Sequence, residues 1–210
     1  MSEKQRIVAR GTDIEQSQAG PVKIRFTESK ENEGFVELWL DYEKADTPTR
    51  AYFADYVSVV MGRADITLIF GRLIPGTERL RSQVEISFPH DGFVAQLWKS
   101  TRAMHQTLKA ATHRQIKSLN KVDFSEIVHT SRANNVFIAI MGEEAILDFY
   151  YIAPSELQFV RMGRRHTVAL EPVIRISLPE ALVLEFLNCC EVVVSKIPEA
   201  QRILEREERA

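Results

Sequence analysis

A series of strand-like segments occurs twice in this chain, in the same order, and this repetition restricts the fold more than any other feature. In each copy two apolar segments flank a Met-Gly pair, a third segment ends in Ser-x-Pro, and a helical segment follows. The segments of copy one are 57–62, 66–70 and 84–89, and those of copy two are 137–142, 145–149 and 174–179. The pattern predicts two β-β-β-α units.

The spacing between the two copies changes only at turns. The Met-Gly pairs lie 80 positions apart, and the prolines Pro75 and Pro154 lie 79 apart. Pro89 and Pro179 lie 90 apart, because copy two carries 11 extra residues around 157–170. Length changes confined to turns are typical of structural repeats.

Each unit predicts a sheet with one buried face. Val84, Ile86 and Phe88 alternate with polar residues, and Pro89 and Pro179 are suited to the first turn of a helix that covers this face. One such unit is too small to bury a good core alone, so we expect the two to pack together. The predicted fold class is α+β, with antiparallel sheets, helices on one face and pseudo-two-fold symmetry.

The remaining segments frame the two units. Residues 1–20 are polar and lack periodicity, which indicates a mobile arm. Alternating apolar residues in 21–45 predict a β-hairpin that extends the sheet. We expect repeat one at 46–122, repeat two at 123–197, and a short helix and charged tail at 198–210.

Copy one contains Tyr52-Phe53-Ala54-Asp55, the strands of 57–70, Pro75-Gly76, the strand 84–89 and the helix 97–108. This pattern resembles a family of short prokaryotic domains of unknown function. Copy two keeps Asn134-Asn135, Pro154 and the strand 174–179, but it lacks a Gly after Pro154. The resemblance implies the β-β-β-α outline in two tandem copies and no activity. A weaker resemblance to the export-chaperone fold implies an antiparallel sheet with helices on one side.

The helical segment of copy one is the sharpest functional hint. No acidic residue occurs between Gly92 and Asp123. One face of the predicted helix is apolar, and the opposite face carries Lys99, Arg102, Lys109, His113, Lys117 and Lys121. This face either contacts phosphates, an acidic protein or an anionic membrane surface, or is simply solvated.

A second basic group lies in the insertion of copy two. It contains Arg161, Arg164 and Arg165, followed by His166. Insertions on a repeat scaffold often carry the specialised contact, so these arginines are candidates for contact with a partner or with phosphates. The alternative is a solubilising hairpin tip, since the sequence matches no phosphate-binding loop.

The helical segment of copy two is apolar on nearly all sides, from Ala181 to Val194. It is expected to be buried on several sides, either between the repeats or in the interface of a homo-oligomer. Its two thiols, Cys189 and Cys190, are interpreted as core residues in a reducing compartment. The N-terminus lacks a signal-peptide core and no apolar run reaches bilayer length, which predicts a cytoplasmic protein without a transmembrane segment.

No motif in the chain predicts catalysis, a cofactor or a metal. The histidines lack metal-ligand spacing, and the carboxylates have no acid-base partner in sequence. The net charge of −2 excludes a globally basic nucleic-acid binder. We therefore predict a non-enzymatic binding or assembly module that contacts another protein. Nucleic-acid binding through the basic helix and Arg164-Arg165, and chaperone-like holding of unfolded chains, are the alternatives.

Overall fold

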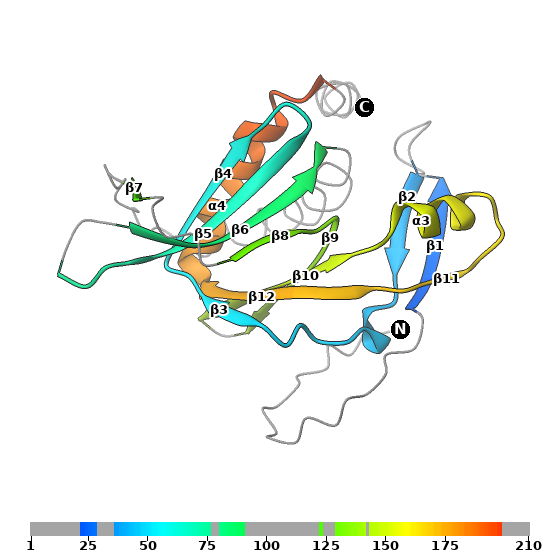
Figure 1. The fold of residues 1–210 in the computed structure, drawn as a ribbon, viewed down its shortest axis with the longest axis horizontal. Helices are drawn as coiled ribbons and strands as arrows, with labels where there is room; N and C mark the ends of the chain where they lie inside the picture. Colours follow the sequence, from blue (N-terminus) through cyan, green and yellow to red (C-terminus); the bar gives the residue numbers. More distant parts are fainter. Residues whose placement is uncertain are drawn as a thin grey trace, which may run out of the picture.

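The fold consists of two main β-sheets that share one core, with a third, smaller sheet at one end of the molecule (Figure 1). The computed structural model describes residues 22–28, 36–76, 80–90, 122–123, 129–141 and 143–198. Within these ranges the chain is α+β, with antiparallel and parallel strand pairs and two α-helices, α3 and α4.

Sheet one is formed around the predicted strands of copy one. Strands β4, β5 and β6 pair antiparallel in chain order, as the alternation predicts, and two short strands pair parallel to β6. The bounds are β4 Tyr56–Met61, β5 Asp65–Leu73, β6 Leu80–Pro89, β7 Val122–Asp123 and β8 His129–Arg132.

Sheet two is formed around the predicted strands of copy two. Strands β9, β10 and β12 pair antiparallel, and the short strand β3 pairs parallel to β12. The bounds are β3 Ala51–Phe53, β9 Asn135–Met141, β10 Glu144–Tyr151 and β12 Glu171–Pro179. The sequence patterns had predicted neither β3 nor β8.

Two segments of chain pass from one sheet to the other. After β3, the Ala54 N–H donates to Ser177 O in sheet two at 2.8 Å, and the next N–H, that of Asp55, donates to Gly71 O in sheet one at 3.0 Å. After β8, the order of the sheets is reversed. The Ala133 N–H donates to Ser87 O in sheet one at 2.9 Å, and the Asn134 N–H donates to Tyr150 O in sheet two at 3.0 Å. The sheets are therefore joined along both sides.

Four phenylalanines from different elements meet in the centre of the core. Phe70 of β5 lies 5.8 Å from Phe149 of β10 and 6.0 Å from Phe186 of α4, measured between ring centroids. Phe88 of β6 lies 6.1 Å from Phe149. Each ring is at most 1% exposed, and burying such a side chain contributes about 1.5–3 kcal/mol. The two sheets consequently depend on one core.

Helix α4 (Glu180–Val194) contacts β4 of sheet one as well as β12 and β10 of sheet two, so it lies between the predicted repeats. Its fully buried residues form a single stripe: Val183, Phe186, Leu187, Cys190, Val193 and Val194. Val192 is 57% exposed, so the expectation of burial on several sides was wrong. Pro179 is the N-cap of the helix and not a residue of its first turn.

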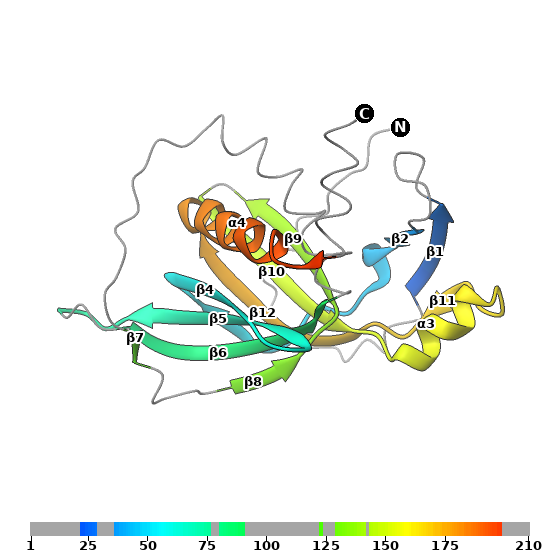
Figure 2. The ribbon, with the colours of Figure 1, turned by 90° about the horizontal axis from the view of Figure 1, so that it is seen from above.

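The predicted N-terminal hairpin is confirmed as β1 (Val22–Glu28) and β2 (Val36–Leu40). It was wrongly expected to extend a main sheet, because β1 pairs instead with β11 (Thr167–Val168). The hairpin, α3 (Pro154–Arg161) and the end of β10 enclose a second core at the end of the molecule remote from α4 (Figure 2). This core contains Val22, Ile24, Leu40, Tyr150, Ile152, Val160, Val168 and Leu170.

Candidate functional site

The predicted arginines of the insertion lie at the end of helix α3. Arg161 is the last residue of the helix, Arg164 and Arg165 follow it, and all three are exposed. The interpretation of this segment as a hairpin tip was wrong, because Pro154 begins a helix at a position where a missing N–H is tolerated. The predicted cations of the earlier helical segment lie outside the described residues: Lys99, Arg102, Lys109, His113, Lys117 and Lys121.

A glycine fixes the direction of the chain after α3. Gly163 has a φ of 68°, in the left-handed region that side chains with a Cβ disfavour. The Gly163 N–H donates to Val160 O and the Arg164 N–H donates to Phe159 O, both at 2.9 Å. These two bonds form a Schellman motif, which ends the helix and directs Arg164 away from its axis.

Arg165 returns to the helix and is held there by two contacts. Its Nη1 lies 3.6 Å from Glu156 Oε1, and its guanidinium carbon lies 5.3 Å from the centroid of the Phe159 ring. Glu156 is itself oriented, because its Oε2 accepts a 2.7 Å hydrogen bond from the Ala169 N–H. Cation–π contact and ion pairing together order a side chain that is otherwise free in solvent.

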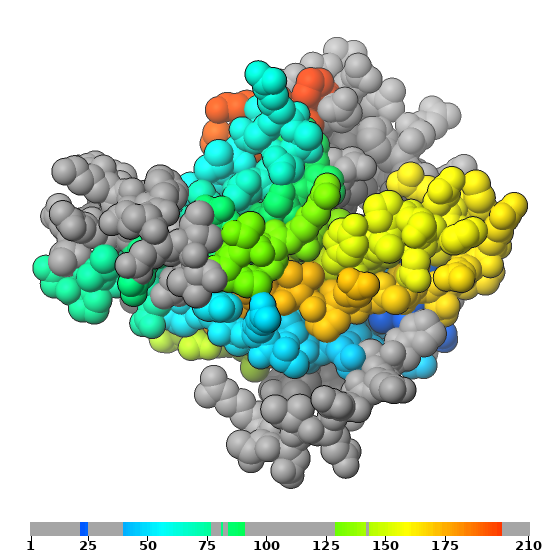
Figure 3. All heavy atoms as spheres, viewed as in Figure 1, coloured from blue at the N-terminus to red at the C-terminus, as the bar shows by residue number. Residues whose placement is uncertain are grey.

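We define the α3 tip as Phe159, Arg161, Met162, Arg164 and Arg165. Phe159 is 39% exposed and Met162 is 55% exposed, so exposed apolar side chains occur at the same end of the helix as the arginines, and Arg165 contacts the Phe159 ring. The other side of the helix is anchored, since Val160 is buried and Leu157 packs against the second core. The helix forms part of the protruding yellow end of the molecule in Figure 3. The α3 tip is therefore an exposed surface on a well-supported element.

A polar group that the sequence patterns missed lies where β3 and β8 approach each other. In β8, His129 and Ser131 point to the inner face, beside Val84 and Ile86 of β6. Tyr52 of β3 packs against the same core, and its ring lies 6.4 Å from that of His129 at an angle of 16°. We call this group, together with Arg50, the β3–β8 junction.

The hydrogen bonds of the junction determine which groups carry protons. Arg50 Nη1 lies 3.4 Å from His129 Nδ1, and His129 Nε2 is hydrogen-bonded to the Ser131 hydroxyl. Arginine can only donate, so Nδ1 accepts and Nε2 carries the ring proton. Nε2 then donates to Ser131 Oγ. This polarity is opposite to that of a catalytic serine–histidine pair, in which the ring accepts the serine proton.

The outer face of sheet two carries a buried ion pair. Arg175 donates from Nε and Nη2 to Asp148 Oδ1 and Oδ2, both at 2.6 Å, and these hydrogen bonds raise the pKa of Arg175. Tyr42 of the 3-10 helix η1 (Tyr42–Lys44) and Tyr150 lie nearby, with ring centroids 5.7 Å apart. Burial raises the pKa of both tyrosines. Arg175 and the two tyrosines therefore keep their protons at neutral pH, which indicates a structural role.

The thiols of α4 lack the properties of reactive cysteines. Cys190 is fully buried and Cys189 is half-buried. Burial raises the pKa of both thiols, so they stay protonated, whereas the thiolate is the nucleophile and the metal ligand. Among the residues that the structure describes, no group of three or more His, Cys, Asp or Glu side chains is arranged to hold a metal ion.

Comparison with known proteins gives no match: neither a protein-family model, nor a curated protein, nor a solved structure resembles the chain significantly. Neither of the two described α-helices is long and apolar enough to cross a membrane.

Two candidate sites follow from the geometry. The α3 tip contains arginines that the sequence predicted, and the β3–β8 junction contains residues that it did not.

Proposed function

We propose that this protein is a non-enzymatic binding module that docks another protein through the α3 tip. One observation carries the proposal: an exposed aromatic ring, an exposed methionine and three exposed arginines occur at the end of α3 and in the residues that follow it. Aromatic residues, Met and Arg are the types enriched at protein interfaces, and Arg and aromatic residues are frequent among those that contribute most binding energy. Lysine, which interfaces disfavour, does not occur between 150 and 170.

The α3 tip is also organised before binding. The Schellman motif, the Arg165–Glu156 contact and the packing of Val160 fix the backbone and one of the three arginines. A surface that is ordered in the free protein loses less conformational entropy on binding. Arg161 and Arg164 add positive charge beside the exposed apolar groups. The partner fits best as an acidic protein segment with an apolar side chain for Met162 and Phe159.

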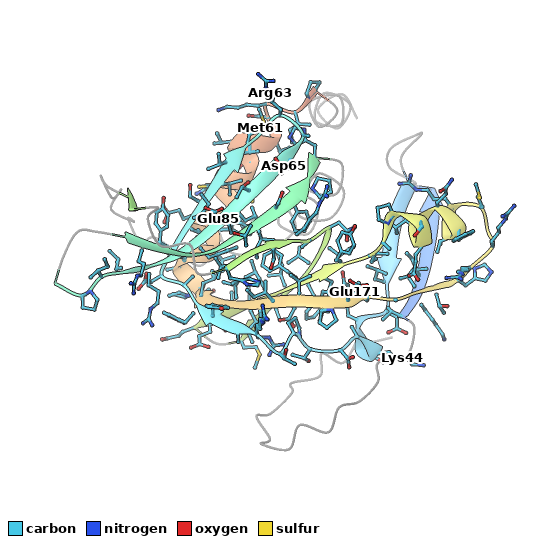
Figure 4. The ribbon with its side chains drawn as sticks, in the orientation of Figure 1. Lys44, Met61, Arg63, Asp65, Glu85 and Glu171 are labelled. Carbon is cyan, nitrogen blue, oxygen red and sulfur yellow. The ribbon has the colours of Figure 1, made fainter. Side chains whose placement is uncertain are left out.

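The test compares two charge- and shape-changing variants. Met162→Glu and Arg164→Glu should abolish association with a protein partner. Arg63→Glu is the control and should leave it unchanged. Arg63 lies on the β4–β5 turn, far from η1 and the β1–β2 end of the molecule (Figure 4). Proteins retained from the source cell would be quantified by mass spectrometry for the wild type and all three variants. An identical set retained by wild type and Met162→Glu would contradict the proposal.

Nucleic acid is the second candidate, and the stacking of Arg165 on Phe159 favours it. An exposed aromatic ring beside arginines is a common arrangement for binding single strands. Titration with labelled single- and double-stranded nucleic acid at two salt concentrations separates the candidates. Affinity that falls steeply with salt and is lost in Arg164→Glu would place nucleic acid first, whereas absence of binding at low salt would exclude it.

We further propose that the two sheets derive from a duplicated β-β-β-α unit with pseudo-two-fold symmetry. The sheet-changing hydrogen bonds of Ala54 and Asp55 are matched by those of Ala133 and Asn134. The Leu73 N–H donates to Asp55 Oδ1 at 2.6 Å, and the Ile152 N–H donates to Asn134 Oδ1 at 2.9 Å. All these pairs have an offset of 79 positions (54 and 133, 55 and 134, 73 and 152).

The same offset applies within the strand ladders. Met61 pairs with Ile66, and Ile140 pairs with Ala145, so Met61 corresponds to Ile140 and not to Met141. The strand register therefore does not favour the matching of the two Met-Gly pairs, whose spacing of 80 differs by one from this offset. The proposal is tested by splitting the chain between 122 and 123. The two fragments should fold only when mixed, because β3 and β8 each complete the sheet of the other fragment.

A further inference from the structure

The third strand of each half ends in the same way. Pro89 of β6 pairs with Asp65, the first residue of β5. Pro179 of β12 pairs with Glu144, the first residue of β10. The chain enters α4 directly after Pro179, and His90, which follows Pro89, is likewise helical. The strand register therefore makes the two prolines equivalent, which sets an offset of 90 positions for the residues that follow them.

Helix α4 emerges from one sheet and lies mainly against the other. It follows β12 of sheet two, but its main contact is with β4, the edge strand of sheet one. The strand that corresponds to β4 in sheet two is its edge strand β9, where Ile138 and Ile140 occupy the positions of Val59 and Met61. Ile138 and Ile140 both border the main core. A helix that follows β6 and corresponds to α4 would lie against these residues.

The connection from β6 to β7 needs a crossover of this kind. Val122 of β7 pairs parallel with Leu80 of β6, so the chain returns from the end of β6 to its beginning. Parallel strands require a crossover of a dozen or more residues, which is usually a helix. Residues 91–121 make this return and lie outside the described residues. A helix over 91–108 would span about 27 Å, close to the roughly 30 Å between Leu80 and Pro89 along the strand.

We propose that residues 91–108 form a helix whose uncharged side docks on β9, as the counterpart of α4 on β4. The inference rests on the proposed duplication and not on the α3 tip. An offset of 90 relates the buried stripe of α4 to six residues of this segment, none of which is charged: Phe93, Gln96, Leu97, Ser100, Ala103 and Met104. The side that should meet the core thus carries no ionised group, which would be costly to bury.

The same offset assigns the cations of the segment to the outer side. Arg102 corresponds to Val192 of α4, which is 57% exposed. Lys99 corresponds to Cys189, which is half-buried, and a lysine there can extend its ammonium group to water. Docking on β9 therefore leaves the basic face of the helix in solvent, where it is accessible to an acidic partner.

Methyl NMR of the full chain tests the docking. With isoleucine, leucine, valine and methionine methyl groups labelled, we expect nuclear Overhauser contacts from Leu97 or Met104 to Ile138 or Ile140. Contacts between α4 and β4 methyl groups are the positive control. Absence of the expected contacts while the control contacts are present would overturn the proposal. Contacts found only between labelled and unlabelled chains in a mixed sample would overturn it too, and would assign β9 to a second copy.

Unfolding of variants provides a second measurement. Leu97→Ala and Ile140→Ala should be coupled, so that the unfolding constant of the double variant differs at least about threefold from the product of the single effects. Leu97→Ala combined with Val59→Ala, on the strand that carries α4, is the matched control and should be multiplicative within about twofold. Multiplicative behaviour of Leu97 with Ile140 would contradict the docking. If chain fragments split between 122 and 123 still folded only when mixed, the duplication itself would stand.

Discussion

The first half of the molecule (β4, β5 and β6) and the second half (β9, β10 and β12) have the same order of strands but differ in what surrounds them. In the second half, Ile152 follows β10 and is fully buried in the second core. In the first half, the corresponding residue is Leu73, which is 37% exposed. A common strand framework thus supports a second core in one half only, and the α3 tip is found where that core exists.

The outer faces of the two halves carry different residues at matched positions. Asp148 and Arg175 are paired across β10 and β12, whereas the corresponding positions in β5 and β6 are Ile69 and Glu85. Ile69 is buried without the need for a charged partner. The inner faces of the two halves pack together in one core, whereas their outer faces differ in the residues that they carry.

Removal of a central ring should affect both halves together. Phe149→Ala and Phe70→Ala are each expected to lower the free energy of unfolding by about 3–5 kcal/mol, because each opens a cavity in the shared core. Urea denaturation followed by circular dichroism and by tryptophan fluorescence gives the measurement. Two separate transitions in either variant would show that the halves are independent, which would break the comparison.

Substitution by alanine at two matched positions, Ile152 after β10 and Leu73 at the end of β5, should distinguish the halves. Ile152→Ala is expected to destabilise the protein by about 2–4 kcal/mol, because Ile152 is fully buried in the second core. Leu73→Ala is the matched variant and should change stability by only about 0.5–1 kcal/mol, since Leu73 is already partly in water. Equal effects of the two substitutions would mean that Leu73 is as well buried as Ile152.

Loss of the ion pair should have a smaller effect than either core variant in the second half. Asp148→Asn is expected to cost about 2 kcal/mol, below the range for fully buried pairs because the Arg175 side chain is 27% exposed. Glu85→Gln is its counterpart in the first half, where Glu85 lies on β6 (Figure 4), and should change stability by less than about 0.5 kcal/mol. Unfolding of both variants at neutral pH provides the comparison.

The smallest effect is expected at Glu185 of α4, whose pKa is raised by burial. The folded state holds the proton more tightly than the unfolded state, so this residue favours folding below its ordinary pKa of 4.5 and loses that contribution as pH rises through the folded value. Glu185→Gln should stabilise the protein at pH 7 by less than about 1 kcal/mol and have no effect at low pH. Thermal unfolding across this range would reveal a difference that grows with pH, and a constant difference would contradict the assignment.

The sequence predicted the long strands because their side chains alternate. Val84, Ile86 and Phe88 occupy one face of β6 as expected, and the pairing of neighbours in sequence follows from short turns. It did not predict β3 and β8, which are three and four residues long and pair in parallel with strands far along the chain. Alternation over only three or four residues is too weak to identify a strand.

The candidate sites differ for the same reason. Arg161, Arg164 and Arg165 are contiguous enough to be recognised, although Pro154 was interpreted as a turn signal and not as the start of a helix. His129 and Ser131 have the spacing of residues on one face of a strand, which is a signal only once β8 is known. Arg50 and Tyr52 reach them through pairing with β12, which no local pattern contains.

The parallel pairing of β3 with β12 also dictates an order of events during synthesis. Ala51 leaves the ribosome long before Arg175, its partner in the ladder, has been made. The first half must therefore wait with an unpaired strand and an open apolar face, and the closing step comes only when nearly the whole chain has emerged. We expect the nascent protein to depend on chaperones over this interval and to be most sensitive to translational pausing between β8 and β12.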